Sequence, residues 1–173
     1  MSYLSLFDST ADFSPCRTWR YTLWRRWKDG GKIVAFLCLN PSTADEVQND
    51  PTIRRCIRFA QDWGYDGLCM TNIFAFRATD PKDMKAALDP VGPDNDMWLK
   101  KIVDEALLVV AAWGTHGNFK GRDADVTKIL YSAMMRNGKD IRCLGLTKRG
   151  SPKHPLYLRK DSELIPLIEG CMP

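Results

Sequence analysis

Two continuous apolar runs constrain the fold of this chain most strongly. They are KIVAFLCLN, from Lys32 to Asn40, and ALLVVAAWG, which ends at Gly114. Apolar runs without alternation are typical of strands that are buried on both faces, as in a parallel sheet. The stretches LCMTN, ending at Asn72, and DIRCLGLT, ending near Thr147, predict two further strands.

Helical patterns lie between these runs. The predicted helices are PTIRRCIRFAQDWG, which begins at Asp50-Pro51, GPDNDMWLKKIVDEA, DADVTKILYSAMMRNG, and a short C-terminal helix over about 161–170. Alternating strands and helices predict an α/β fold, a three-layer α/β/α sandwich with a central four-stranded, mainly parallel sheet. We expect a single domain over residues 1–173, with ligands bound outside the carboxyl ends of the strands.

Composition favours an ordinary globular protein. The chain has 173 residues, of which 45% are hydrophobic and 27% charged. No apolar run approaches the roughly 18 residues that a membrane span needs, and the N-terminus does not resemble a signal peptide, so we expect a cytoplasmic protein. We also expect a monomer. The six Cys form no C-x-x-C pair, which favours buried free thiols; we expect no metal and no cofactor.

The net charge of +4 is modest, but the basic residues are clustered. CRTWRYTLWRRWKDGGK places Arg17, Arg20 and Arg25 among three Trp and a Tyr. Such a stretch can bind phosphate backbones, or it can form an amphipathic helix whose Trp side chains pack inward, and the two can coexist. A second basic cluster, TKRGSPKHPLYLRK, contains Lys148 and Lys153.

Polar residues follow the first two predicted strands. Asn40, Pro41 and Ser42 form either a capped turn or a polar site that orients a water or a ligand. Asn72 ends the second strand, and its amide can pair with the edge of a base. Phe74 or Phe76 could stack on the face of that base, or Asn72 could cap a turn over two core rings.

The last two strand ends carry both histidines of the chain. After the third strand, His116, Lys120 and Arg122 could meet a phosphate, or they could belong to an ordinary glycine-containing turn. After the fourth strand, Ser151 and His154 lie in a loop stiffened by prolines. His154 could stabilise a leaving group as a cation, or donate a hydrogen bond to it. No G-x-S-x-G, Walker, G-x-G-x-x-G or H-E-x-x-H motif supports other chemistries.

These strand ends, in this order, resemble the uracil-DNA glycosylase superfamily. The similarity is carried by LNPS, CMTNIFAFRA, AAWGTHGNFKG and GSPKHPLYL. It implies that Asn40 places or activates the attacking water, Asn72 reads the base and His154 assists its departure. It also implies that Leu156 or Tyr157 wedges into the base stack.

The whole chain also looks like a member of the DUF1643 family, through LNPSTAD, NDPTIRR, TNIFAFRATDP, GPDND and GSPKHPLYL. The expected function is a glycosylase that flips out and excises a uracil-like or modified base from nucleic acid, in the first place DNA. The alternatives are a non-catalytic binder of nucleic acid or nucleotide, and an enzyme acting on a free modified nucleotide. The expected catalytic residues are Asn40 and His154. The expected base-binding residues are Pro41, Ser42, Asn72, Phe74 and Phe76, and the expected nucleic-acid contacts are Arg17, Arg20, Arg25, His116, Lys120, Arg122, Lys148, Ser151, Lys153 and Leu156.

Overall fold

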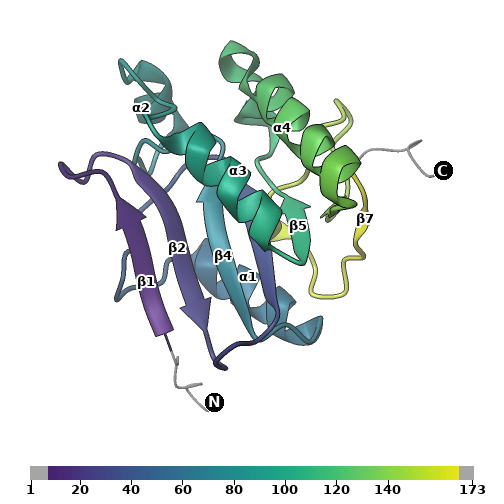
Figure 1. Cartoon of the computed structure of the whole chain (residues 1–173). Coiled ribbons are helices and arrows are strands. Elements are labelled where there is room, and N and C mark those ends of the chain that lie inside the picture. Colours follow the sequence, from purple (N-terminus) through teal and green to yellow (C-terminus); the bar gives the residue numbers. More distant parts are fainter. Residues whose placement is uncertain (1–7, 168–173) are drawn as a thin grey trace.

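A seven-stranded mixed sheet forms the centre of the molecule (Figure 1). The structure is a computed structural model that describes residues 8–167. The strands are β1 (Asp8–Phe13), β2 (Arg20–Arg26), β3 (Ile33–Cys38), β4 (Gly67–Asn72), β5 (Leu108–Ala111), β6 (Asp140–Cys143) and β7 (Ile165–Pro166). The helices are α1 (Pro51–Asp62), α2 (Pro81–Ala86), α3 (Asn95–Glu105) and α4 (Arg122–Asn137), with 3₁₀ segments η1 (Thr115–Gly121) and η2 (Pro155–Tyr157).

The strand order is β1-β2-β4-β3-β5-β6-β7. The four predicted strands β4, β3, β5 and β6 are neighbours at the centre and run parallel to one another. On either side, β2 and β7 pair antiparallel with β4 and β6, and β1 pairs antiparallel with β2. The α/β class is therefore confirmed, but the sheet is wider than the predicted four strands and is mixed.

The basic stretch at residues 17–28 is not a helix, so that prediction was wrong. It forms β2, whose aromatic and β-branched residues favour a strand. Leu23 packs into the core from this strand, and the buried guanidinium groups of Arg20 and Arg25 find backbone acceptors. A strand with charged residues can lie inside the sheet because most of the donors on those charges are hydrogen-bonded, chiefly by a neighbouring loop.

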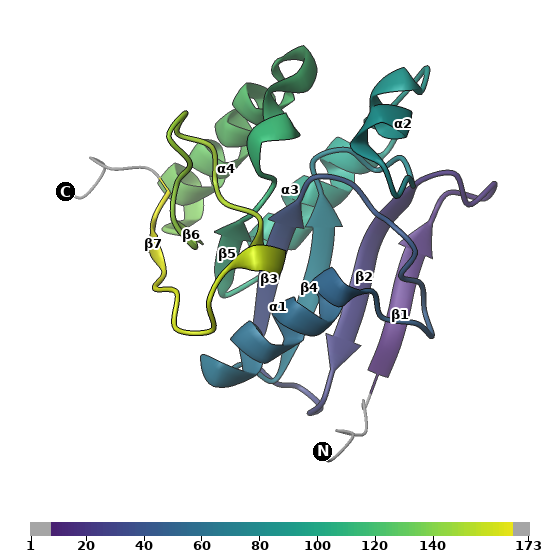
Figure 2. The same cartoon turned by 180° about the vertical axis from the view of Figure 1, so that it is seen from behind.

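Helices cover both faces of the sheet, as Figures 1 and 2 show from opposite sides. On one face, Phe36 of β3 packs in a cluster with Ile53 and Phe59 of α1. On the other face, Leu37 packs in a second cluster that includes Leu99 of α3 and Leu130 of α4. Successive residues of β3 thus enter two different cores, which explains why this strand is apolar without alternation.

Helix ends follow the sequence closely. Asp50 caps α1 by accepting a hydrogen bond from the backbone N–H of Ile53 at 2.9 Å, and Gly138 ends α4 in a left-handed conformation. The predicted helix over 161–170 was wrong for the residues that the structure describes, which form a turn and irregular segments around β7; the rest of that range lies outside them.

The thiols agree with the prediction in most positions. Cys38, Cys56, Cys69 and Cys143 are buried and free, whereas Cys16 is exposed. Cys171 lies outside the described residues.

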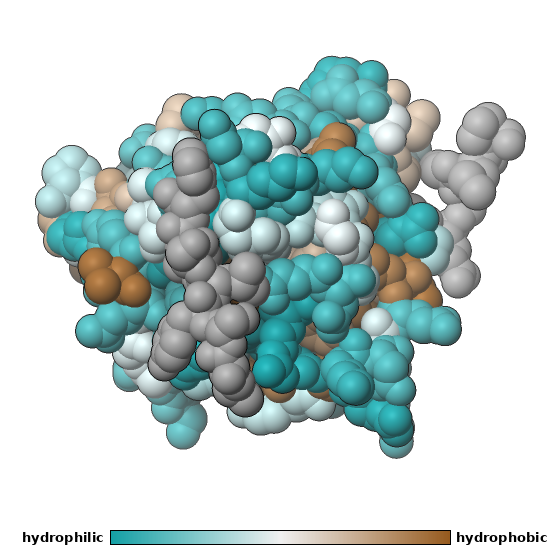
Figure 3. Space-filling model, turned by 90° about the horizontal axis from the view of Figure 1, so that it is seen from below, coloured by the Kyte–Doolittle hydropathy of each residue, from teal (hydrophilic) through white to brown (hydrophobic). Residues whose placement is uncertain are grey.

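The end of the molecule opposite the carboxyl ends of the parallel strands carries mostly hydrophilic side chains (Figure 3). None of the helices in residues 8–167 combines the length and apolar character that a membrane crossing requires.

Candidate functional site

A pocket of about 600 Å³ lies where the carboxyl ends of β3 and β5 meet the loop that follows β6. Its volume is in the range of small-molecule sites. The polar side chains on its wall include those of Asn40, Ser42, Asp50, His116 and His154. The position agrees with the rule that ligands bind outside the carboxyl ends of parallel strands.

Asn40 joins two of the loops that form the pocket. Its amide nitrogen donates to the carbonyl oxygen of Ala78 at 2.7 Å and to that of Pro41 at 3.1 Å. These bonds fix the orientation of the amide group and occupy both of its donors. The amide oxygen of Asn40 accepts no hydrogen bond from residues 8–167, and it is therefore available to a water or a ligand.

Asp50 supplies the carboxylate on the pocket wall. One of its oxygens caps α1, and the other accepts no hydrogen bond from the described residues. A carboxylate that is held by one oxygen keeps the second as an acceptor of a proton or a hydrogen bond. The negative charge also reaches His154, where it raises the pKa of the imidazole and so opposes the effect of burial.

The ring of His154 is held in one tautomer. The backbone N–H of Leu156 donates to its Nδ1 at 3.4 Å, so the neutral ring carries its proton on Nε2. Burial lowers the pKa of His154 below its ordinary value, with a smaller opposing effect of Asp50. The neutral form is therefore favoured near pH 7. Of the two roles predicted for His154, hydrogen-bond donation fits this state.

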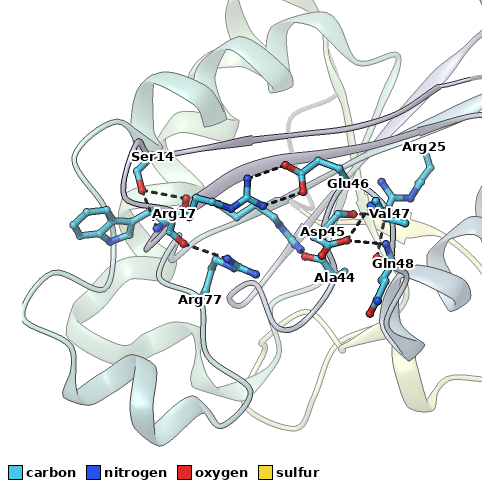
Figure 4. Close-up of polar contacts among 11 residues, drawn as sticks. Ser14, Arg17, Arg25, Ala44, Asp45, Glu46, Val47, Gln48 and Arg77 are labelled. Atoms are coloured by element: carbon cyan, nitrogen blue, oxygen red, sulfur yellow. Dashed lines mark hydrogen bonds and ion pairs between the residues drawn. The ribbon is translucent and has the colours of Figure 1, made fainter.

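Buried arginines shape the loop between β3 and α1 (Figure 4). Arg25 donates from Nε to the side-chain oxygen of Asn49 at 2.8 Å, and from Nη2 to the carbonyl oxygens of Asp45 at 2.5 Å and Gln48 at 3.2 Å. Arg20 donates to the carbonyl oxygen of Ala44 at 2.8 Å. Burial lowers the pKa of both guanidinium groups, that of Arg20 to about 10. Two strand residues thus hold the loop that leads into Asp50.

Two further contacts brace the same loop from its outer side. Arg17 forms a double ion pair with Glu46, with both nitrogen–oxygen distances at 2.9 Å. The carboxylate of Asp45 accepts from the backbone N–H groups of Val47 and Gln48, which lowers the pKa of Asp45. The loop is therefore hydrogen-bonded along most of its length.

Three arginines that we predicted to contact nucleic acid are buried, and that prediction was wrong for them. Arg20 and Arg25 bind the loop described above. Arg122 donates to the carbonyl oxygen of Ile73 at 2.7 Å and to Asp96 at 2.5 Å. A guanidinium group that is closed off by the protein and already bonded to it cannot reach a phosphate backbone.

The predicted base-binding residues of β4 and its following loop are not on the pocket wall. Asn72 is 2% exposed, and its side-chain oxygen accepts from Arg20 at 3.4 Å. Phe74 is fully buried in the core, and Phe76 packs against the same cluster. Pro41 is also buried, whereas Ser42 lines the pocket. Asn72 and the two rings are therefore not among the residues that line the pocket with Asn40 and His154, and in this structure they are not exposed to a base bound there.

The remaining predicted contacts lie nearer the surface. Lys120, Lys148 and Lys153 are exposed, as are Arg17 and His116, while Ser151 and Leu156 are half-buried. Leu156 lines the pocket together with Tyr157, which is 88% exposed at its rim.

Two residues at or beside the pocket were not assigned to the site from the sequence. Asp50 was recognised as a helix start, but its position in the pocket depends on the loop that Arg25 holds. Lys85, whose ammonium lies 3.2 Å from Nδ1 of His116, was not assigned to the site. No group of three or more His, Cys, Asp or Glu side chains suited to a metal ion occurs in the described part of the chain.

The fold and the pocket together define a mixed α/β protein with a pocket at the carboxyl ends of its parallel strands. The DUF1643 family, described as proteins of unknown function, matches residues 20–156, and the chain belongs to this family. The match runs from the start of β2 into η2, and it includes every residue that lines the pocket except Tyr157. Neither a search of curated proteins nor a search of solved structures finds a match.

Proposed function

We propose that this protein hydrolyses the N-glycosidic bond of a uracil-like or modified base bound in the pocket. The observation that carries the proposal is the state of His154. Its Nδ1 is occupied by a backbone N–H and its pKa is lowered by burial, so it offers a neutral Nε2–H donor in the pocket that contains Asn40 and Asp50. A fixed donor of this kind suits negative charge that develops on a leaving base.

In the proposed reaction, the amide oxygen of Asn40 orients a water molecule and the carboxylate of Asp50 accepts its proton. The water oxygen forms a bond to the anomeric carbon, and the bond between that carbon and the base nitrogen breaks. The electron pair leaves with the base, which His154 stabilises by a hydrogen bond from Nε2 until the base is protonated. The exposed ring of Tyr157 at the rim could stack on the base or on its neighbour.

Release of free base is the direct test. The protein is incubated with oligonucleotides and with free nucleotides that carry uracil or modified bases, and released base is measured by liquid chromatography and mass spectrometry. We expect release from at least one substrate. Asp50→Asn should reduce the rate by roughly 100-fold or more, the usual contribution of a general base. The variant keeps the side-chain oxygen that caps α1, so it should fold normally.

His116→Gln serves as the matched control for His154→Gln, because both histidines line the same pocket. Loss of base release at saturating substrate in the His154 variant, with the maximal rate retained in the His116 variant, supports the assigned role; a weaker substrate affinity of the His116 variant does not bear on it. Absence of free base from the wild-type protein with every substrate, despite measurable binding, would instead support the second candidate, a non-catalytic nucleotide binder.

The burial of three arginines bears on the size of the substrate. Arg20, Arg25 and Arg122 are buried, so fewer cationic side chains can contact a phosphate backbone than the sequence alone indicated. This favours a small substrate or a short contact with a polymer. A polymer substrate predicts that binding weakens strongly as salt is raised, whereas a single nucleotide predicts a weak dependence.

A further inference from the structure

Two lysines and a histidine that the proposed reaction does not use lie on or beside the pocket wall. His116 of η1 lines the pocket, and Nζ of Lys85 lies 3.2 Å from its Nδ1. An ammonium group has only donors, so Nδ1 of His116 accepts this bond and the ring proton lies on Nε2. The contact therefore presents one cation and one N–H donor next to the pocket.

A second lysine contacts the same aromatic ring as Lys85. The Nζ atoms of Lys85 and Lys120 each lie 5.5 Å from the centre of the Phe119 ring. Lys120 adopts a positive φ of 53°, a conformation that residues with a side chain seldom adopt. Neither lysine forms an ion pair with a carboxylate within residues 8–167. We refer to Lys85, His116 and Lys120 as the Lys85 cluster.

We propose that the Lys85 cluster is a phosphate-binding subsite of this pocket. Unpaired ammonium groups and a ring N–H are suited to a tetrahedral anion, and the hydroxyl groups of Thr79 and Thr115 on the adjoining wall can add neutral donors. The substrate class is then a phosphorylated nucleoside, with its base near Asn40, Asp50 and His154 and its phosphate at Lys85. The assignment of the base rests on the proposed function, whereas the assignment of the phosphate does not.

Inorganic phosphate tests the subsite directly. The chain has two histidines, so the ring signals of His116 and His154 can be followed one by one in a carbon–proton NMR spectrum and assigned with His116→Gln. We expect phosphate to shift the His116 signal in a saturable manner and to leave His154 nearly unchanged. Sodium chloride at equal ionic strength should not reproduce the shift.

Two lysines of α2 provide a matched pair of variants. Lys85→Met should weaken phosphate binding at least tenfold. Lys82→Met removes the same charge from an exposed position on the same helix, and should change binding less than twofold. Both changes lie on a short surface helix, and thermal unfolding followed by circular dichroism verifies the fold. A His116 signal that does not respond to phosphate, or equal effects of the two substitutions, would overturn the proposal.

The source of the phosphate is distinguished by comparing three ligands in isothermal titration calorimetry: a nucleoside, its 5′-monophosphate and a short oligonucleotide. If a free nucleotide is the substrate, the monophosphate binds at least tenfold more tightly than the nucleoside, and Lys85→Met removes that difference. If the backbone of a polymer supplies the phosphate, only the oligonucleotide shows the dependence on Lys85. Equal binding of all three ligands contradicts the subsite even if base release is observed. Phosphate binding without any base release contradicts the proposed reaction alone.

Discussion

Replacement of Arg25 by Met should destabilise the protein substantially. Met retains the aliphatic stem but removes the three hydrogen bonds that Arg25 donates to Asp45, Gln48 and Asn49 in the loop before α1. Each hydrogen bond from a charged donor contributes about 1.5–3 kcal/mol. The Met variant no longer buries a charged group, and the desolvation cost that it avoids offsets several kcal/mol of the lost hydrogen-bond energy. We expect a net loss of about 3 kcal/mol in the free energy of unfolding.

Urea denaturation measures this loss, and Arg17→Met is the matched control. Arg17 contacts the same loop through Glu46, but the pair is solvent-exposed and screened, so we expect a far smaller change. Hydrogen exchange at the backbone amides of Val47 and Gln48 should become faster in the Arg25 variant, because these amides bond within the loop. A loss below about 1 kcal/mol, the size of one ordinary hydrogen bond, would refute the assignment of Arg25 as the main support of the loop.

Four further results are expected. Asp50→Ala should cost about 1 kcal/mol of stability through loss of the α1 cap while Asp50→Asn costs less, as urea denaturation can measure. Burial lowers the pKa of His154 in the folded protein, so as the pH falls through about 6.5 the ring binds a proton more readily in the unfolded state, and this proton binding favours unfolding. The urea concentration at the midpoint of unfolding should therefore fall with acidification, and it should fall less in His154→Gln. The pKa of Cys16 is lowered to about 7, chiefly by hydrogen bonding from Ser14, so alkylation mapped by mass spectrometry should modify it ahead of the buried thiols, with a midpoint near pH 7. In Gly117→Ala, the new Cβ would overlap the ring of Trp113, and thermal unfolding should show a loss of about 1–3 kcal/mol.

The central strands and the location of the pocket could be predicted because local patterns determine them. An apolar run that fills two cores, as β3 does, has few alternatives to a central position. The cap at Asp50 and the stop at Gly138 depend on residues within one turn of the helix end. Once the strands were assigned, the side chains after β3, β5 and β6 followed as pocket candidates.

The errors come from residues whose partners are distant in sequence. Arg20 and Arg25 look like surface charges until the carbonyl groups of residues 44–48 are brought against them. Asn72 follows a strand in the same way as Asn40 does, yet its side chain bonds to buried Arg20 and Asn40 lines the pocket. Residue type and spacing are similar in the two cases, so only the tertiary contacts separate a structural amide from one that can meet a ligand.

The pairing of β2 has a consequence for how the molecule folds. The β1–β2 hairpin is local, but Leu23 of β2 pairs with Met70 of β4, and β3 and α1 lie between them in the chain. Such long-range pairing is slow to form, so we expect the hairpin to dock after the β3-α1-β4 unit has assembled. Because the hairpin brings Arg20 and Arg25, the loop before Asp50 becomes ordered only at that step. The part of the pocket wall that contains Asp50 would then mature only after β4 has formed.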